Sequence, residues 1–137
     1  MVRLRSFVAT SLLLVACGGA VSPSRQIPLE QEITLAPGER VGTAELRVTF
    51  DRVGADSRCP SDVRCIWEGD ASVVLGVEMQ GAAGCALELH TAATLQREGR
   101  CGAHGVRLVR LVPEPVSAAP PIPPASYRAT LIVFAAR

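Results

Sequence analysis

The five cysteines are the side chains whose chemistry says most about this chain; they are Cys17, Cys59, Cys65, Cys85 and Cys101. A thiol can be acylated, can pair as a disulfide, or can bind a metal ion as its thiolate. An odd number of cysteines is awkward in an exported protein, because one thiol is left without a partner. If Cys17 has a different role, the remaining four cysteines can pair. The residues before Cys17 indicate such a role.

The segment before Cys17 has the three parts of a bacterial secretory signal. Arg3 and Arg5 form a positive n-region, and Phe7 to Val15 form an apolar h-region. The apolar stretch is too short for a transmembrane helix, which needs about 20 residues. It ends in Leu14-Val15-Ala16-Cys17, which resembles the bacterial lipobox of an aliphatic residue, a tolerant position, a small residue and a cysteine. An ordinary signal peptide in which Cys17 is incidental is the alternative.

Cys17 is therefore the expected site of lipidation. Its thiol would take a diacylglyceryl group as a thioether, and residues 1–16 would be removed behind Ala16. Two or three acyl chains, such as palmitate, make anchoring stable, whereas a single chain binds a membrane only marginally. Gly18 is not the aspartate of an inner-membrane retention signal, so in a bacterium with two membranes the outer membrane is favoured. We expect a lipid-anchored protein of the cell envelope with residues 17–26 as its tether.

The four remaining cysteines allow three pairings. We favour Cys59–Cys65 together with Cys85–Cys101, because each pair closes a local loop and an oxidising compartment favours the bond. Each disulfide would contribute roughly 2–3 kcal/mol by restricting the unfolded chain.

A metal site is the rival interpretation of the second cysteine pair. Cys85, His90, Cys101 and His104 supply two thiols and two imidazoles, a ligand set that suits zinc. Their spacing of Cys-x4-His and Cys-x2-His matches no standard zinc pattern, and exported thiols usually oxidise. No metal and no cofactor is therefore expected in the favoured interpretation.

The stretch around the first cysteine pair holds the most distinctive charged and aromatic residues. One interpretation is a scaffold, in which the aspartates cap turns and the arginines pair with Glu68 or Asp70. Trp67 would then lie across the loop base with its ring buried and its indole N–H bonded. The other interpretation is a recognition loop, in which Arg58 and Trp67 are the main contacts because both types are enriched at interface hot spots. The candidate recognition residues are Asp56, Arg58, Asp62, Arg64 and Trp67.

The same stretch resembles a group of uncharacterised bacterial exported proteins, many of them lipoproteins. They share Asp-Ser-Arg-Cys-Pro-x-x-Val-x-Cys-x-Trp-x-Gly, which this chain carries from Asp56 to Gly69. The likeness extends more weakly to Leu111, Pro113, Pro115 and the closing strand at Tyr127, and so spans most of the mature domain. Glu68 and the second cysteine pair depart from that group. The resemblance implies location and architecture, and it brings no established activity.

Apolar and polar residues alternate along the mature chain with the period of a β-strand, and no amphipathic helix is indicated. Leu46, Val48 and Phe50 form the cleanest half-buried row. Further strands are expected at 27–35, 71–79, 85–90, 106–112 and 127–133, with a turn at 80–84. Residues 113–126 are rich in proline and predict a stiff surface connection. We predict an all-β domain over residues 27–137, a small antiparallel β-sandwich of about six to seven strands, immunoglobulin-like, with a small barrel as the alternative.

Charge and motif content argue against several functions. The net charge is +1, and loss of residues 1–16 removes Arg3 and Arg5, which leaves 12 arginines against 13 acids. A chain with so small a net charge has no strong positive electrostatic potential to attract phosphate groups, so nucleic acid is not an expected partner. The chain lacks a Gly-x-Ser-x-Gly elbow, a His-Glu-x-x-His motif and a phosphate-binding glycine loop. We expect a non-enzymatic structural or protein-binding lipoprotein, whose partners are the membrane and an envelope protein. A metal- or ligand-binding protein, or a protease inhibitor that uses the Cys59–Cys65 loop, is the alternative.

Overall fold

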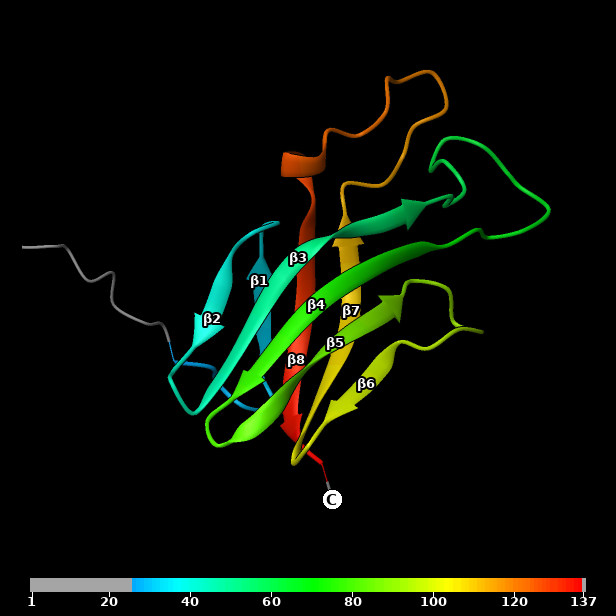
Figure 1. Cartoon of the computed structure of the whole chain (residues 1–137). Helices are drawn as coiled ribbons and strands as arrows, with labels where there is room; N and C mark the ends of the chain where they lie inside the picture. Colours follow the sequence, from blue (N-terminus) through cyan, green and yellow to red (C-terminus); the bar gives the residue numbers. More distant parts are fainter. Residues whose placement is uncertain (1–25, 137) are drawn as a thin grey trace, which may run out of the picture.

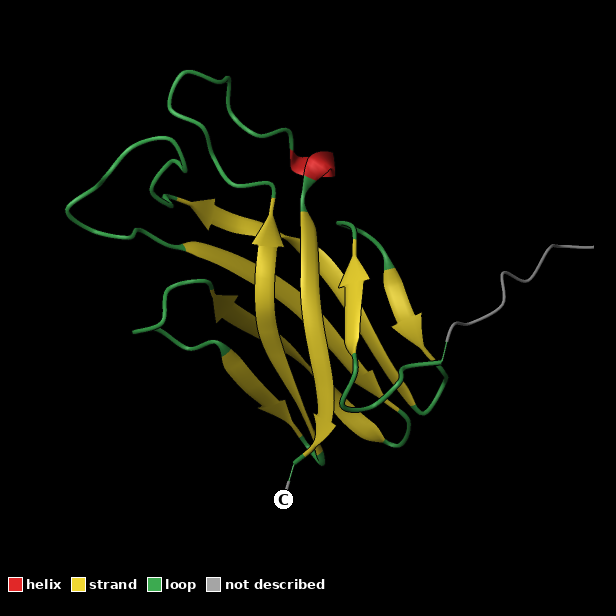
Figure 2. Ribbon diagram, turned by 180° about the vertical axis from the view of Figure 1, so that it is seen from behind, coloured by secondary structure: helices red, strands yellow, loops and turns green. Residues whose placement is uncertain are grey.

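The structure, a computed structural model, describes residues 26–136, so the predicted signal peptide, Cys17 and the tether up to residue 25 lie outside the described residues. The eight strands are β1 (Glu32–Leu35), β2 (Arg40–Gly42), β3 (Leu46–Asp56), β4 (Ala71–Met79), β5 (Ala82–His90), β6 (Glu98–Cys101), β7 (His104–Val112) and β8 (Arg128–Ala135), and a single-turn 3-10 helix (Pro124–Ser126) precedes β8. They form two four-stranded sheets with antiparallel pairing (Figures 1 and 2). The predicted all-β antiparallel sandwich is confirmed. No helix of the described part has the length and apolarity needed to cross a membrane.

Most strands follow one another as meanders. One sheet runs β2-β3-β4-β5, and in the other, β1-β8-β7-β6, the consecutive strands β6, β7 and β8 are neighbours while β1 pairs with β8. An immunoglobulin domain instead has Greek-key connections, and the connectivity differs from the expected one in this respect. The two strands that sequence patterning did not predict, β2 and β6, have three and four residues. Such short segments show no clear alternation.

The core lies between the two sheets and is made by alternate residues of each strand. Leu46, Val48 and Phe50 point inward as predicted, and Phe50 is fully buried. The other sheet contributes Leu108, Leu131 and Val133, which are at most 1% exposed. All residues of the buried core lie between Ile33 and Val133. Since these core residues all belong to the described part of the chain, we expect residues 26–137 to fold as a unit, which circular dichroism can verify.

Irregular pairing shapes two of the strands. Register shifts lie between Phe50 and Arg52 and between Val53 and Ala55 in β3, and between Leu108 and Arg110 in β7. An extra residue at such a bulge bends a strand and increases its twist. The shift in β7 explains why Arg110 blurs the alternation of that segment. The shifts in β3 lie in its last half, where the chain leaves the sheet toward the cysteine loop, which we define as residues 57–70.

The cysteine loop and the start of the described chain lie at opposite ends of the sandwich (Figure 1). Gln26 lines a surface pocket together with Thr43 and Leu46, at the beginning of β3. The cysteine loop begins after Asp56, at the other end of that strand of 11 residues. A strand of this length spans roughly 33 Å at about 3.3 Å per residue. Gln26 and the cysteine loop are thus separated by about the length of β3.

The two sheets are joined at one edge by a disulfide. Strands β5 and β6 are edge strands of different sheets and share no ladder hydrogen bonds. Cys85 of β5 is bonded to Cys101 of β6, with their Cα atoms 6.1 Å apart. Gly99 faces Leu87 and Leu89 so closely that a Cβ there would crowd both side chains. The bond thus holds the edge of the sandwich closed over a tightly packed part of the core.

Candidate functional site

The cysteine loop is closed at its base by backbone pairing and at its middle by the first disulfide. The Ser57 N–H donates to the Asp70 carbonyl at 2.7 Å, and the Cys59 N–H donates to the Glu68 carbonyl at 2.9 Å. Cys59 is bonded to Cys65 with a Cα–Cα distance of 5.9 Å. Both disulfides thus follow the favoured pairing. The loop enters β4 through Gly69, whose φ of 69° favours glycine and whose missing Cβ makes room for the backbone of Ser57.

Arg58 is the central brace of the loop. Its guanidinium binds Asp56 through two parallel hydrogen bonds, Nε to Oδ1 at 2.9 Å and Nη2 to Oδ2 at 2.7 Å. It also donates to the carbonyl of Leu111 at 2.7 Å and to that of Pro113 at 2.8 Å. The side chains of Arg58 and Asp56 are only 11% and 12% exposed. Arg58 therefore ties the loop to the end of β7, and little of its side chain is left exposed to contact a partner. Its expected pairing with Glu68 or Asp70 is also replaced by the pairing with Asp56.

The hydroxyl of Tyr127 completes this cluster by donating to Asp56 Oδ2 at 2.9 Å. Burial alone would raise the pKa of Asp56, but hydrogen bonds from Arg58 and Tyr127 and the charge of Arg58 outweigh burial and lower the pKa. Burial, together with the Asp56 carboxylate, raises the pKa of Tyr127 above its ordinary value. Asp56 is therefore a charged, fully engaged acceptor, and not a free acid for catalysis.

Asp62 joins the cysteine loop to the proline-rich segment 113–126. Ser117 donates to it twice, from its N–H at 2.9 Å and from its hydroxyl at 2.6 Å. These hydrogen bonds lower the pKa of the Asp62 carboxyl. Next to it, the Ser61 N–H donates to the Pro115 carbonyl at 2.9 Å. Two loops 55 residues apart in sequence thus support each other, which the spacing of residues did not indicate.

Asp70 fixes the other side of the loop. It accepts hydrogen bonds from His90 Nδ1 at 2.6 Å and from the N–H groups of Thr91 and Ala92, both at 3.0 Å. Burial alone would raise the pKa of Asp70, but the hydrogen bonds from Ala92, His90 and Thr91 lower it overall. The partners lie about 20 residues away across β4 and β5. No local sequence signal marks such a contact, and for this reason sequence reasoning missed it.

The tip of the cysteine loop is apolar and exposed. Ile66 is 93% exposed, Trp67 81% and Val63 45%. The prediction that Trp67 lies buried across the loop base is wrong, because its side chain is exposed at the tip, while backbone hydrogen bonds and Gly69 form the base. Arg64 is also exposed. Of the five candidate recognition residues, the structure leaves Arg64 and Trp67 at the surface of the tip, while Asp56, Arg58 and Asp62 brace it.

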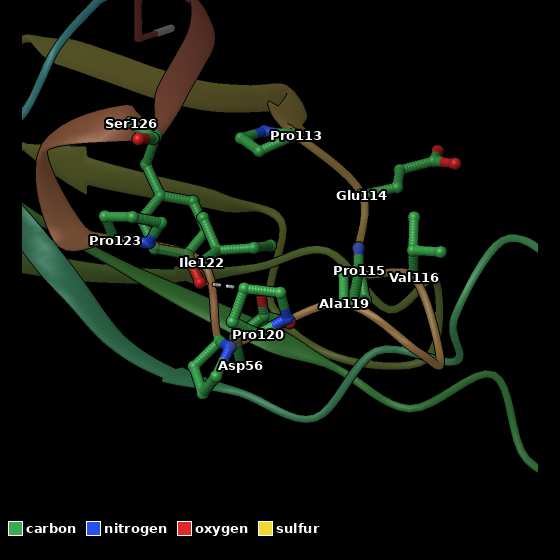
Figure 3. A pocket seen from close by; sticks show the side chains of 12 residues that line it. Asp56, Pro113, Glu114, Pro115, Val116, Ala119, Pro120, Ile122, Pro123 and Ser126 are labelled. Carbon is green, nitrogen blue, oxygen red and sulfur yellow. Dashed lines mark hydrogen bonds between the residues drawn. The ribbon is translucent and has the colours of Figure 1, made fainter.

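The proline-rich segment forms an open arch over a pocket beside this cluster. The pocket has a volume of about 660 Å³ and is lined by prolines, with Asp56 and Tyr127 among its walls. In Figure 3, Ile122 and Pro123 lie across it from Pro115. Ile122 packs on the hydrophobic core, which anchors the arch. The segment is a surface connection, as predicted, and it also supports the cysteine loop.

The residues of the alternative metal site are not arranged as ligands. Cys85 and Cys101 are bonded to each other and offer no thiolate. His104 lies opposite Cys101 in the β6–β7 pair. His90 lies at the far end of β5, roughly 16 Å along the strand from Cys85, and binds Asp70. Among residues 26–136, no group of three or more His, Cys, Asp or Glu side chains is arranged to hold a metal ion.

The Cys59–Cys65 ring does not present an extended segment. Inside it, the Val63 N–H donates to the Pro60 carbonyl at 3.3 Å, which makes a turn. Ser61 and Asp62 are engaged by the proline-rich segment. A substrate-like inhibitor loop needs an extended backbone that a protease can bind, and this segment does not have that geometry.

These observations describe a small β-sandwich with two disulfides and a braced loop that ends in an exposed apolar tip. No protein-family model, no curated protein and no solved structure matches the chain.

Proposed function

We propose that this chain is a lipid-anchored, non-enzymatic protein of the cell envelope that binds another envelope protein through the tip of its cysteine loop. The tip is defined as Val63, Arg64, Ile66 and Trp67. The observation that carries the proposal is the exposure of Ile66 and Trp67, 93% and 81%, on a loop that a disulfide and hydrogen bonds of Arg58, Asp62 and Asp70 hold in place. The membrane anchor is the acylated Cys17 predicted from the lipobox.

The energetics support a binding role for the tip. Burial of one large apolar side chain contributes roughly 1.5–3 kcal/mol of free energy. A partner that covers two adjacent exposed apolar side chains would gain this free energy from both of them. Binding usually costs conformational entropy, and a loop that is already rigid avoids much of that cost. Trp and Arg side chains are also the types most often found at interface hot spots. The scaffold and the recognition interpretations thus apply to different residues of the same loop.

A photocrosslinking amino acid at position 66 tests this proposal in cells. We expect a discrete crosslinked product from position 66 that contains one defined partner, because the side chain lies in the tip. The matched control is the same substitution at Ala86, an exposed residue of the β5 edge strand. Trp67→Ala should weaken partner binding roughly 30-fold or more, the effect of a hot-spot residue, without changing the melting temperature. Equal products from positions 66 and 86, or binding unchanged by Trp67→Ala, would contradict the proposal.

The anchor is tested separately in the same cells with a clickable fatty acid. The wild-type protein should be labelled and the Cys17→Ser protein should not. Persistent labelling of Cys17→Ser would overturn the anchor and leave the tip proposal standing.

A further inference from the structure

The outer face of the sheet β1-β8-β7-β6 is basic, although the whole chain is nearly neutral. The four strands of this sheet hold four arginines and two glutamates, a net charge of +2. The four strands of the other sheet hold three arginines and four acids, a net charge of −1. The charges of the sandwich are therefore separated between its two faces. A balanced total hides this separation.

Three exposed arginines define what we call the arginine face: Arg107, Arg110 and Arg128. The register places Arg107 opposite Ile132, Arg110 opposite Thr130, and Arg128 opposite Val112. The three side chains thus follow one another along the β7–β8 pair over roughly 17 Å. They alternate with the inward residues Leu108 and Leu111, which puts them on the outer side of the sheet.

Hydrogen bonds hold the three guanidinium groups in place, and two of the three positive charges are not neutralised by an ion pair with a described residue. Arg110 Nε donates to the Thr130 hydroxyl at 3.3 Å, and Arg128 Nη1 donates to the carbonyls of Ala125 and Tyr127 at 2.8 and 2.6 Å. Neither Arg110 nor Arg128 forms an ion pair with any described residue. Arg107 pairs with Glu98 at 2.8 Å.

An aromatic ring belongs to the same face. The guanidinium of Arg107 lies 5.5 Å from the centre of the Phe134 ring. Phe134 and Ile132 are half-buried, so part of each faces outward. Arginines beside an aromatic and an aliphatic side chain are a combination that suits the interface between water and lipid.

We propose that the arginine face binds the anionic phosphate headgroups of a phospholipid bilayer and lays the sandwich on its side against the membrane. A row of fixed cations complements the phosphates of a bilayer surface, and an anchored domain meets that surface at high effective concentration. The choice of a lipid surface rests on the proposed anchor at Cys17. A ten-residue tether can extend to about 35 Å, comparable to the length of β3, so it permits this orientation.

Vesicle flotation with the domain of residues 26–137, which has no lipid, tests the proposal independently of acylation. We expect binding at low ionic strength to vesicles of phosphatidylglycerol and phosphatidylcholine, and none to phosphatidylcholine alone or in 0.5 M salt. Arg110→Gln with Arg128→Gln should reduce binding to the anionic vesicles roughly 30-fold. The matched control is Arg47→Gln with Arg52→Gln on the other sheet, which changes the net charge equally and should reduce binding by less than about threefold.

Three outcomes would overturn the proposal. If both double variants lost vesicle binding to the same extent, binding would depend on the net charge of the domain and not on the arginine face. Equal binding to neutral vesicles would show that phosphate charge is not recognised. Binding to heparin or an acidic protein, with no flotation on anionic vesicles, would assign the face to a different polyanion. A failure here leaves the tip of the cysteine loop and the anchor untouched, because neither enters this experiment.

Discussion

Replacement of Arg58 by alanine is expected to lower the free energy of unfolding of the domain by about 3 kcal/mol, near the lower end of the range for breaking a buried ion pair. The variant leaves the Asp56 carboxylate, only 12% exposed, without its main partner. It also removes the donor from the carbonyls of Leu111 and Pro113. For a domain of this size the melting temperature should fall by roughly 12 °C. Urea denaturation followed by circular dichroism measures the change.

The control for Arg58 is Arg52→Ala, which removes an exposed arginine of the same strand-and-loop region and should change stability by no more than about 0.5 kcal/mol. The double variant Asp56→Ala with Arg58→Ala should be more stable than the sum of its single variants predicts, because it removes both charges together. A loss below about 1 kcal/mol for Arg58→Ala, similar to that of a surface ion pair, would show that Arg58 is not the brace described here.

Removal of the second disulfide is the other change with a large expected effect. The Cys85→Ala, Cys101→Ala variant should lose about 3 kcal/mol, because the bond closes a segment of 16 residues in the unfolded chain. Since β5 and β6 share no ladder hydrogen bonds, we also expect the amides of these two strands to exchange with solvent faster than those of β3 and β8. Hydrogen exchange with urea denaturation measures both effects.

The first disulfide supplies the comparison. Cys59→Ala with Cys65→Ala opens a segment of only 6 residues, so the expected loss is smaller, about 2.4 kcal/mol. Its faster exchange should be confined to the cysteine loop. If the two double variants lost exchange protection in the same residues, the separate roles of the bonds would be refuted.

Much of the fold could be predicted because the strands bury one face. The alternation at Leu46, Val48 and Phe50 and the turn after Met79 are both present in the structure. The strand expected at 27–35 is shorter, since β1 begins only at Glu32 and the positive φ of Glu30 interrupts the extended chain. Local patterning cannot detect such a backbone interruption when a non-glycine residue makes it.

The candidate site could be predicted only in part, since its contacts join distant residues. The cysteine pairs were predictable from their spacing and the compartment. The burial of Trp67 and the surface pairing of Arg58 with Glu68 or Asp70 were wrong, because the usual rule buries tryptophan and exposes arginine. Here the indole is exposed at the loop tip, and a bidentate carboxylate with two carbonyls satisfies a buried guanidinium. Both facts depend on which segments meet in space.

Trp67 is the only tryptophan of the chain, so its fluorescence tests the central claim that the braced loop displays an exposed apolar tip. In the folded domain we predict a red-shifted emission and acrylamide quenching nearly as strong as in the urea-unfolded chain, with the fold verified by circular dichroism. A blue-shifted emission protected from acrylamide in the folded domain would place the indole inside the protein and contradict the account.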